Sequence, residues 1–166
     1  LALTYEPIKD LKIKITGGLI SSDTRSSAFV TSKYYTGVSS ASLSRPNTTS
    51  FFFFLFVTYD KTIGKHSLQL MSGYTFQDHK TTSLSASGAG FLSDIFDAYN
   101  LGAAKTPGIP SSSYEYSTLI SALGRINYDF DKRFLATINF RADGSSVYSE
   151  KNKWGYFPSG SVAWRI

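Results

Sequence analysis

The sequence contains no cysteine among its 166 residues. Disulfides, thiolate metal sites and cysteine nucleophiles are therefore excluded within it. Charged residues are also scarce, at 17% of the chain against the quarter that is typical of soluble domains. Lys and Arg outnumber Asp and Glu by 17 to 12, but the basic residues are scattered rather than clustered. An ordinary solvated excess of positive charge is favoured, so we do not expect nucleic acid as a partner.

Long apolar runs are missing as well. The longest is Phe51–Val57, far short of the roughly 20 residues that a membrane-spanning helix needs. Leu1 opens directly into alternating sequence, so we expect no signal peptide within these residues. If this chain meets a bilayer, it does so with strands.

The residue types that carry catalysis or bind metals form no recognisable set. His66 and His79 are not accompanied by cysteines or by a carboxylate cluster that would complete a metal site. Asp94 and Asp97 lie in a polar stretch without the surroundings of a glycosidase carboxylate pair. The glycine-rich stretch at 87–91 has no lysine-bearing helix after it, as a phosphate loop would. We therefore expect no catalytic residue, no metal and no cofactor, and we expect a protein that is not an enzyme.

Aromatic residues are abundant instead, with 13 Phe, 11 Tyr and 2 Trp. Apolar and polar residues alternate in several segments, which indicates strands with one apolar and one polar face. The alternation predicts an all-β, antiparallel, up-and-down arrangement of about seven strands, at residues 1–5, 11–19, 51–60, 68–77, 115–128, 134–141 and 154–166.

The predicted connections alternate between short and long. The stretches 21–50 and 78–114 are rich in Ser, Thr and Gly and are read as long loops, and 142–153 is read as a loop of medium length, whereas the other connections are short turns. In an up-and-down sheet all the long loops then gather at one end. Loops of this length are uncommon in compact domains, but outer-membrane barrels combine short periplasmic turns with long extracellular loops.

A set of aromatic residues lies close to the predicted short turns or to the matching chain end. Aromatic residues are common where membrane barrels meet the two bilayer interfaces, although Tyr and Phe are also simply good strand formers. The candidate interfacial girdle consists of Tyr5, Tyr59, Tyr128, Phe130, Phe134 and Trp164.

Two blocks carry a resemblance to a known family. "GRINYDFDKRFLATINFRADGSS" at 124–146 and "KNKWGYFPSGSVAWRI" at 151–166 resemble the barrel of SusC/RagA-type TonB-linked outer-membrane transporters of Bacteroidota. The match extends in one register over nearly the whole of residues 1–166. Family members have a barrel of about 22 strands, filled by an N-terminal plug, and import glycans or oligopeptides with energy delivered by TonB. The resemblance implies a location in the outer membrane and a SusD-like surface lipoprotein as a lid.

An odd set of about seven strands would leave unpaired backbone groups in lipid. We therefore expect residues 1–166 to be a partial barrel segment, without the plug and without the segment that contacts TonB. The alternatives are a stand-alone β-sandwich, or a small outer-membrane barrel, that serves carbohydrate binding or adhesion. Alternation alone does not separate these readings, because a sandwich strand also has one apolar face.

In a barrel the polar face of each strand lines the lumen. The candidate lumen-facing residues are Lys12, Lys14, Arg125, Asn127, Asn139 and Arg141. They could contact cargo, or they could contact the plug or simply solvate the interior. Aromatic residues of the predicted loops could contact cargo or the lid, or could order their own loops: Tyr34, Tyr35, Phe91, Phe96 and Tyr99.

The stretch Phe51–Val57 departs from the family pattern because it is apolar on both faces. One interpretation is a strand whose inner face packs on the plug. The other is an error in the sequence over a few codons. In isolation such a stretch is prone to aggregation under either interpretation.

Overall fold

The structure is a computed structural model that describes residues 1–33 and 37–166. Its strands are β1 (Ala2–Ile8), β2 (Leu11–Asp23), β3 (Ser26–Val30), β4 (Ser40–Ile63), β5 (His66–Phe91), β6 (Ala104–Pro107), β7 (Ser111–Phe130), β8 (Phe134–Ser145) and β9 (Trp154–Trp164). Three short 3-10 helices complete it: η1 (Asp97–Tyr99), η2 (Leu101–Ala103) and η3 (Glu150–Asn152). None of the helices in the described ranges is long and apolar enough to cross a membrane.

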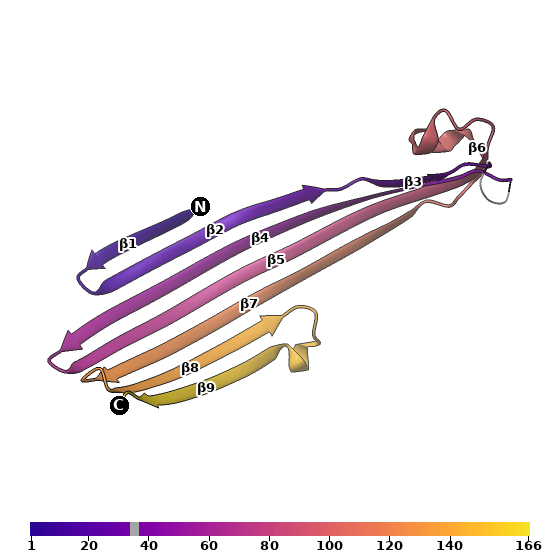
Figure 1. Ribbon diagram of the computed structural model, residues 1–166. Helices are drawn as coiled ribbons and strands as arrows, with labels where there is room; N and C mark the ends of the chain where they lie inside the picture. Colours follow the sequence, from indigo (N-terminus) through magenta and orange to yellow (C-terminus); the bar gives the residue numbers. More distant parts are fainter. Residues whose placement is uncertain (34–36) are drawn as a thin grey trace. The chain divides into compact units, whose positions relative to one another are not determined.

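The strands form one open sheet in the order β1-β2-β4-β5-β7-β8-β9, drawn in Figure 1. The pairings between β1 and β2, between β7 and β8 and between β8 and β9 are antiparallel. The predicted all-β, up-and-down arrangement is confirmed. The seven-strand path matches the seven expected strands, and the short strands β3 and β6 add pairings to β4 and β5 that the sequence did not indicate.

The chain divides into two units. Unit 1 consists of residues 1–19, 50–78 and 117–166, and unit 2 of residues 20–49 and 79–116. Strands β2, β4, β5 and β7 contribute residues to both units. Each unit is described separately below.

The prediction of two long loops was wrong in its boundaries. Much of 21–50 and 78–114 is strand, because β2 and β5 run on while β4 and β7 begin early. Small polar residues pair across these strands, for example Thr48 with Thr81 at 3.1 Å and Ser85 with Ser44 at 3.2 Å. Such strands have little apolar contrast between their faces, so the alternation that identifies a strand is absent from their sequence.

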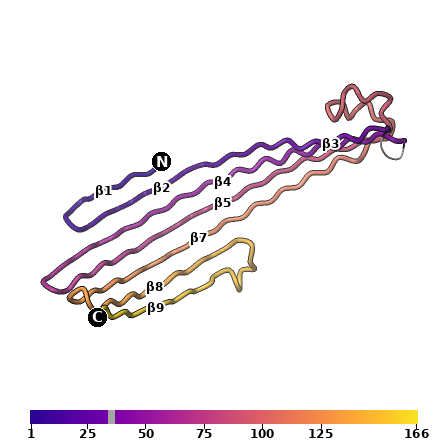
Figure 2. Tube along the Cα trace, viewed as in Figure 1, coloured from indigo at the N-terminus to yellow at the C-terminus, as the bar shows by residue number. Residues whose placement is uncertain are grey.

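The turns of unit 1 that were expected to be short are short. Asp10, Gly64, Asp131 and Lys132 adopt positive φ angles of 71°, 59°, 54° and 58° there, which lets the chain reverse within a few residues. The main-chain N–H of Asp131 donates to the carbonyl of Lys65 at 2.8 Å, so two neighbouring turns are joined. The three turns lie at the same end of unit 1 as the C-terminus (Figure 2). We call this the short-turn end.

The sheet has almost no buried core. Within the described residues, the buried apolar side chains are only Ala41, Ala98 and Ala142. Large residues such as Ile138 (61% exposed) and Val162 (86% exposed) lie open on the sheet. A β-sandwich would bury such residues between two sheets, whereas the described strands form a single layer.

Candidate functional site: the two faces of unit 1

The register of the C-terminal strands separates two kinds of side chain. Arg125 pairs with Asn139, and Leu123 pairs with Arg141. Because alternate residues of a strand share a face, these four side chains lie on one face together with Asn127. We call it the polar face.

The opposite face of the same strands is apolar. Ile126 pairs with Ile138, and Ile138 pairs in turn with Gly160 of β9. Phe140, Tyr156 and Val162 belong to the same face by alternation, and the rings of Phe140 and Tyr156 stack with centroids 6.2 Å apart. We call this the apolar face.

Glycine positions extend the assignment to the other strands of unit 1. A methyl group on Gly73 would meet both the Phe56 ring and the Leu123 side chain, so Phe56 lies on the polar face. A methyl group on Gly18 would meet the ring of Phe52, which shares a face of β4 with Phe56. By the same alternation along β2, Gly18 lies on the polar face too. The candidate residues Lys12 and Lys14 therefore lie on this face as well, as do Arg125, Asn127, Asn139 and Arg141.

Two hydrogen-bond chains cross the polar face. In the first, Gln69 donates to Asp60 at 2.7 Å, Asn127 donates to Gln69 at 2.8 Å, and Thr137 donates to Asn127 at 2.9 Å. This chain links β4, β5, β7 and β8 through side chains alone. Charge-assisted and amide contacts of this kind fix the side chains in defined orientations.

The second chain of hydrogen bonds begins at Arg125, one of the candidate lumen-facing residues. Arg125 donates from Nε to the side-chain oxygen of Asn139 at 2.6 Å, and Asn139 donates to Ser159 of β9 at 3.2 Å. The structure thus brings three of the predicted polar residues, Arg125, Asn127 and Asn139, into two ordered networks. It also adds partners that the sequence did not single out, namely Asp60, Gln69, Thr137 and Ser159.

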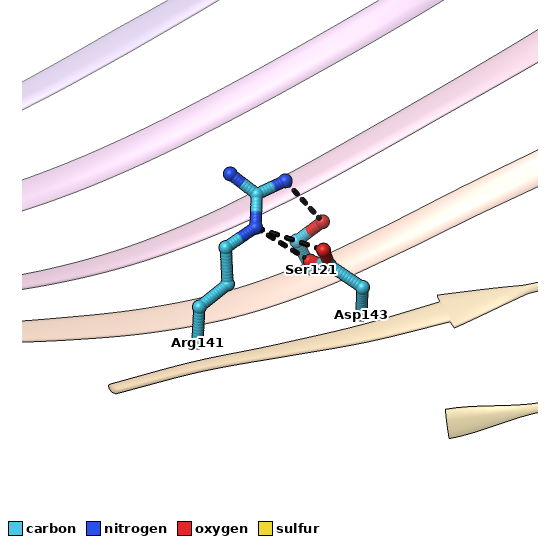
Figure 3. Close-up of polar contacts among 3 residues, drawn as sticks. All are labelled: Ser121, Arg141 and Asp143. Atoms are coloured by element: carbon cyan, nitrogen blue, oxygen red, sulfur yellow. Dashed lines mark hydrogen bonds and ion pairs between the residues drawn. The ribbon is translucent and has the colours of Figure 1, made fainter. Parts of the chain in front are cut away.

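Arg141 belongs to a separate cluster near the end of β8 (Figure 3). Its Nε donates to both carboxylate oxygens of Asp143, at 2.7 and 2.9 Å, and its Nη2 lies 3.4 Å from Oγ of Ser121. Ser121 is fully buried, with 0% of its surface exposed. The carboxylate therefore neutralises Arg141 locally and ties it to the sheet. Sequence reasoning placed residues 142–153 in a loop, but β8 runs on to Ser145.

Lys12 and Lys14 are exposed on β2. Lys12 forms a long ion pair with Glu6 of β1, at 3.7 Å between Nζ and Oε1. Neither lysine belongs to the hydrogen-bond chains around Arg125 and Asn127. The candidate polar residues therefore form two groups on one face, one on β2 and one on β7 and β8.

All six candidate girdle residues lie on the apolar face, near the short-turn end. Tyr5 pairs with Ile13, which lies on the face of β2 opposite Lys12 and Lys14. Tyr59 lies on the face of β4 opposite Phe56. The four others belong to the apolar face of β7, β8 and β9: Tyr128, Phe130, Phe134 and Trp164. Strand register therefore gathers residues that are far apart in sequence.

The rings at this end form a row of contacts. Phe134 and Trp164 stack with centroids 6.1 Å apart and planes 6° apart, and Phe130 follows at 6.5 Å from Phe134. His66 lies 4.9 Å from Phe130, and its Nδ1 is 2.6 Å from the Tyr128 hydroxyl. His66 is exposed beside the turn between β4 and β5, and nothing in the sequence indicates that it belongs to this aromatic row.

Trp154 was not among the predicted girdle residues. It pairs with Gly144, ten residues along β8 from the Phe134–Trp164 pair, and by alternation it lies on the apolar face. The two tryptophans of the chain therefore mark the two ends of the apolar face of β9.

The candidate loop aromatics belong to unit 2. Phe91 ends β5, where its ring lies 5.8 Å from Phe29 and its main-chain N–H donates to Ser39 Oγ at 2.8 Å. The guanidinium carbon of Arg25 lies 4.4 Å from the centre of the Tyr99 ring. Phe96, which precedes η1, is 56% exposed. Tyr34 and Tyr35 lie outside the described residues.

The remaining titratable candidates have structural contacts. Asp94 accepts a 2.5 Å hydrogen bond from Thr31, and Asp97 accepts one from the main chain of Ala98. In the described ranges, no three His, Asp or Glu residues lie close enough together to hold a metal ion. The chemistry that these residues offer is hydrogen bonding and packing.

The sequence of this chain is similar to those of known TonB-dependent receptors. The chain is 32% identical to TonB-dependent receptor P3 of Formosa agariphila over 165 residues, which cover 98% of this chain and 16% of that receptor. It is 48% identical over 50 residues to TonB-dependent receptor SusC of Bacteroides thetaiotaomicron, which is 30% of this chain and 5% of that receptor. No protein-family model matches the chain.

Solved structures agree with these relatives. The RagAB peptide transporter superposes on 95% of this chain with a TM-score of 0.84 and 26% identity, and 18% of its own chain is covered. The siderophore receptor PiuA from Acinetobacter baumannii, with a TM-score of 0.51 and 14% identity, shares the fold alone. The chain thus spans less than a fifth of the length of P3, SusC and the RagAB chain that it matches. By sequence and by fold, it belongs to the SusC/RagA-type TonB-dependent receptors.

Proposed function

We propose that residues 1–166 form part of the barrel wall of an outer-membrane TonB-dependent nutrient importer in a Bacteroidota-like Gram-negative bacterium. The observation that carries the proposal is the division of unit 1 into two chemically opposite faces with no second layer. In this reading the apolar face meets lipid and the polar face lines a wet interior. The short-turn end is periplasmic in this proposal, and the long connections expected at 21–50 and 78–114 are extracellular.

The apolar face has the dimensions that this role requires. From the Phe134–Trp164 pair to the Gly144–Trp154 pair β8 advances ten residues, which is about 33 Å of strand. A strand tilt near 45° reduces this to about 23 Å, close to the ~25 Å height of a barrel's lipid-facing band. Aromatic rings flank the band at both ends, as bilayer interfaces favour.

The six polar candidates then point into the lumen. Arg125, Asn127 and Asn139 are already held in hydrogen-bond chains, so their first role is to give the wall a fixed polar lining. Lys12 and Lys14 lie outside those chains and are the better candidates for contact with cargo or with a segment inside the barrel. Ammonium groups recognise carboxylates and hydroxyls without demanding one geometry.

The cargo that we propose is a glycan or an oligopeptide. The similarity to the RagAB peptide transporter supports oligopeptides, and glycans follow from the resemblance to the SusC/RagA-type family. The partners in this proposal are a SusD-like surface lipoprotein at the extracellular opening and TonB, which would contact a segment outside residues 1–166.

Unit 2 supports the idea of an extracellular partner. Leu92, Ile95, Phe96 and Tyr99 are 101%, 83%, 56% and 76% exposed in one short stretch. Such a group of exposed apolar side chains is typical of an interaction surface. Phe91 and Tyr99 also contact residues of their own unit, so Phe96 is the strongest candidate among them for contact with the lipoprotein.

Spin-label accessibility tests the membrane assignment, because these 166 residues contain no cysteine of their own. Single cysteines at Ile138 and Ser161 would carry nitroxides on opposite faces of the C-terminal sheet, in the whole protein reconstituted in vesicles. We expect the label at 138 to be relaxed by oxygen, which partitions into lipid, and the label at 161 by a water-soluble nickel complex. If neither oxygen nor the nickel complex relaxed the label at either position, both side chains would be buried, as in a β-sandwich, and the proposal would be overturned.

Uptake measurements test the transport step. Deletion of the gene should abolish growth of the source bacterium on one defined glycan or peptide mixture, and a copy of the gene should restore it. Affinity purification of the whole protein should retain a surface lipoprotein. Normal growth of the deletion strain on every glycan and peptide that supports the parent would argue against a role in nutrient import.

A further inference from the structure

A groove lies on the apolar face of unit 1, next to the row of rings at the short-turn end. The register aligns Tyr128, Ala136 and Val162 across β7, β8 and β9. The neighbouring row on the turn side contains the paired residues Phe134 and Trp164. Because alanine is far smaller than the residues around it, a groove of about 490 Å³ opens here. We call it the alanine groove.

The lining of the alanine groove is almost entirely hydrocarbon. Phe134 and Trp164, whose ring planes are 6° apart, form the end wall on the turn side. Tyr128 lines the groove from β7, and its hydroxyl already lies 2.6 Å from Nδ1 of His66. A ligand in this groove therefore loses contact with water but finds few hydrogen-bond partners. These properties suit a flexible hydrocarbon chain.

Two arginines lie directly beyond the end wall. Arg133 precedes Phe134, and its carbonyl accepts a hydrogen bond from the main-chain N–H of Arg165 at 2.8 Å. The two arginines are therefore neighbours across the ends of two strands. Both are exposed, and in the part of the chain that the structure describes neither guanidinium has an ion-pair or hydrogen-bond partner. Like charges directly opposite each other destabilise a sheet, so the pair needs an anion.

Other lysines at the short-turn end differ from this pair. Lys61 lies 3.4 Å from Asp10, and Lys65 lies 3.0 Å from Asp131, so both lysines are neutralised locally. Lys9 is exposed, but it belongs to the turn between β1 and β2, at the other edge of the sheet. The uncompensated positive charge beside the alanine groove is therefore that of its own turn and of the end of β9.

The position of the arginines lets them reach the bilayer surface. Both stand just outside the bounds of β8 and β9, and by alternation their side chains start on the polar face. Long cationic side chains at a bilayer boundary extend until their charge reaches the headgroups. Lys132, in the same turn, adds a third exposed cation, while Asp129 accepts a hydrogen bond from the main-chain N–H of Lys132 at 2.8 Å.

We propose that the alanine groove and the two arginines together bind one anionic phospholipid, with an acyl chain in the groove and the phosphate between the guanidinium groups. The inference rests on the proposed function, because it needs the apolar face to lie in lipid. Planar guanidinium groups match the oxygens of a phosphate in pairs. Ala136 lies two residues along β8 from Phe134, which is about 7 Å of strand, so one lipid molecule reaches both parts.

Charge and apolar surface select this occupant jointly. Inorganic phosphate would satisfy the arginines but would leave the groove empty. A lipid without net charge would fill the groove but would leave the positive charge uncompensated. An anionic phospholipid satisfies both parts at once.

Photolabelling with two lipid probes tests the inference. The whole receptor is reconstituted in phosphatidylcholine vesicles that contain a trace of a lipid with a diazirine in the upper part of one acyl chain. One probe has the anionic phosphatidylglycerol headgroup, and the other has the zwitterionic phosphatidylcholine headgroup. Adducts are mapped by mass spectrometry. We expect the phosphatidylglycerol probe to label residues 134–136 and 162–164 in preference to Ile126 and Ile138, and the phosphatidylcholine probe to label both regions alike.

The pattern of adducts separates this inference from the proposed function. Equal labelling of both regions by both probes would indicate ordinary contact with lipid, which would overturn the phospholipid site and leave the membrane assignment intact. If neither probe labelled any residue of the apolar face, the membrane assignment itself would be overturned. Excess inorganic phosphate should leave the labelling unchanged, and its loss would show that the arginines bind free phosphate instead.

Charge variants test the role of the arginines. Arg133→Gln and Arg165→Gln should each lower the preference for the phosphatidylglycerol probe by about fivefold, the contribution of one basic residue at an anionic surface. Lys9→Gln removes one charge at the same end but away from the groove, and it should leave the preference unchanged. A preference that both arginine variants retain in full would overturn the assignment of the phosphate.

A pair of phenylalanine variants tests the groove. Ala136→Phe should fill it and remove the preferential labelling, whereas Ile138→Phe places a similar ring outside the groove and should not. Both variants put an apolar ring on the lipid-facing side, so both should insert in the membrane, which heat-modified mobility on gels checks. Preferential labelling that persists in inserted Ala136→Phe would overturn the groove as the site of the acyl chain.

Discussion

The ring of Phe56 lies where a side chain on Gly73 would begin, 2.7 Å from the position of that missing methyl group. Leu123 closes the same space from β7, at 2.9 Å. Two apolar side chains from two strands therefore converge on one glycine backbone.

Replacement of Gly73 by Ala should destabilise unit 1. The new methyl group would overlap both the Phe56 ring and the Leu123 side chain, and overpacking of this kind costs about 1–3 kcal/mol. Gly124→Ala is the matched control, because a methyl group there meets only the carbonyl oxygen of Met71 at an ordinary 3.9 Å. The whole protein is reconstituted in vesicles and unfolded with urea. The urea concentration at the midpoint of unfolding should fall for Gly73→Ala and stay unchanged for Gly124→Ala. Equal midpoints for the two variants would contradict the packing described here.

Replacement of Ile138 by Arg should impair membrane insertion. Ile138 lies midway along the apolar face of β8, and a charged residue at the bilayer midplane of a barrel costs about 2–4 kcal/mol. Ser161→Arg on the polar face of β9 should be tolerated. Heat-modified mobility on gels reports folding into membranes in both cases. Efficient insertion of Ile138→Arg would argue that this face does not meet lipid.

The stability of unit 2 should depend on pH through one ion pair. The Nε and Nη2 atoms of Arg45 donate to Asp23 at 3.0 and 2.6 Å, and these hydrogen bonds lower the pKa of the Asp23 carboxyl. The pKa of this carboxyl is therefore lower in the folded state than in the unfolded state, where an Asp has a pKa near 3.9. The ion pair stabilises the fold at a pH above that unfolded-state pKa, and the stabilisation is lost as the pH falls through the folded-state pKa.

Arg45→Gln should therefore make the strands of unit 2 easier to cleave by protease at neutral pH, and by a small amount because the pair is exposed. The difference from the parent should narrow below about pH 4, as measured with an acid-stable protease. Lys33→Gln, which removes a charge elsewhere in unit 2, should behave like the parent at each pH. A difference that persists unchanged into strong acid would exclude Asp23 as the partner that matters.

Arg25→Gln should release the segment that carries Tyr99. A guanidinium over a tyrosine ring contributes about 0.5–1 kcal/mol at an exposed site, and here Arg25 connects the start of β3 with η1. Hydrogen exchange of residues 97–103 should become faster, while the paired strands β7 and β8 keep their protection. Lys105→Gln serves as the control for a change of charge nearby, and unchanged exchange in Arg25→Gln would mean that other contacts order this segment.

Local sequence determined the strands of the C-terminal hairpin well. Alternation predicted a strand at 134–141, and β8 spans Phe134–Ser145. It also assigned Arg125 and Asn127 to a face opposite Ile126 and Tyr128, which the register of β7 bears out. Both results follow from a period of two residues, which is a property of one strand and needs no knowledge of its neighbours.

The extended strands of unit 2 could not be predicted in the same way. The Ser- and Thr-rich residues 79–90 have little apolar contrast, yet they belong to β5 because their backbone pairs with other strands. The contact partners of the predicted residues could not be predicted from the local sequence either. Nothing in the neighbourhood of Asn127 indicates Gln69, and nothing near Phe56 indicates Gly73.

The sequence by itself therefore determined that this chain forms amphipathic strands with polar and apolar faces, short turns at one end and aromatic residues beside them. Only the tertiary structure decided which residues meet across those strands, including Arg125 with Asn139 and Phe52 with Gly18. The physical reason is register: a shift of one residue between paired strands moves every side chain to the opposite face. That choice is made by contacts between distant parts of the chain.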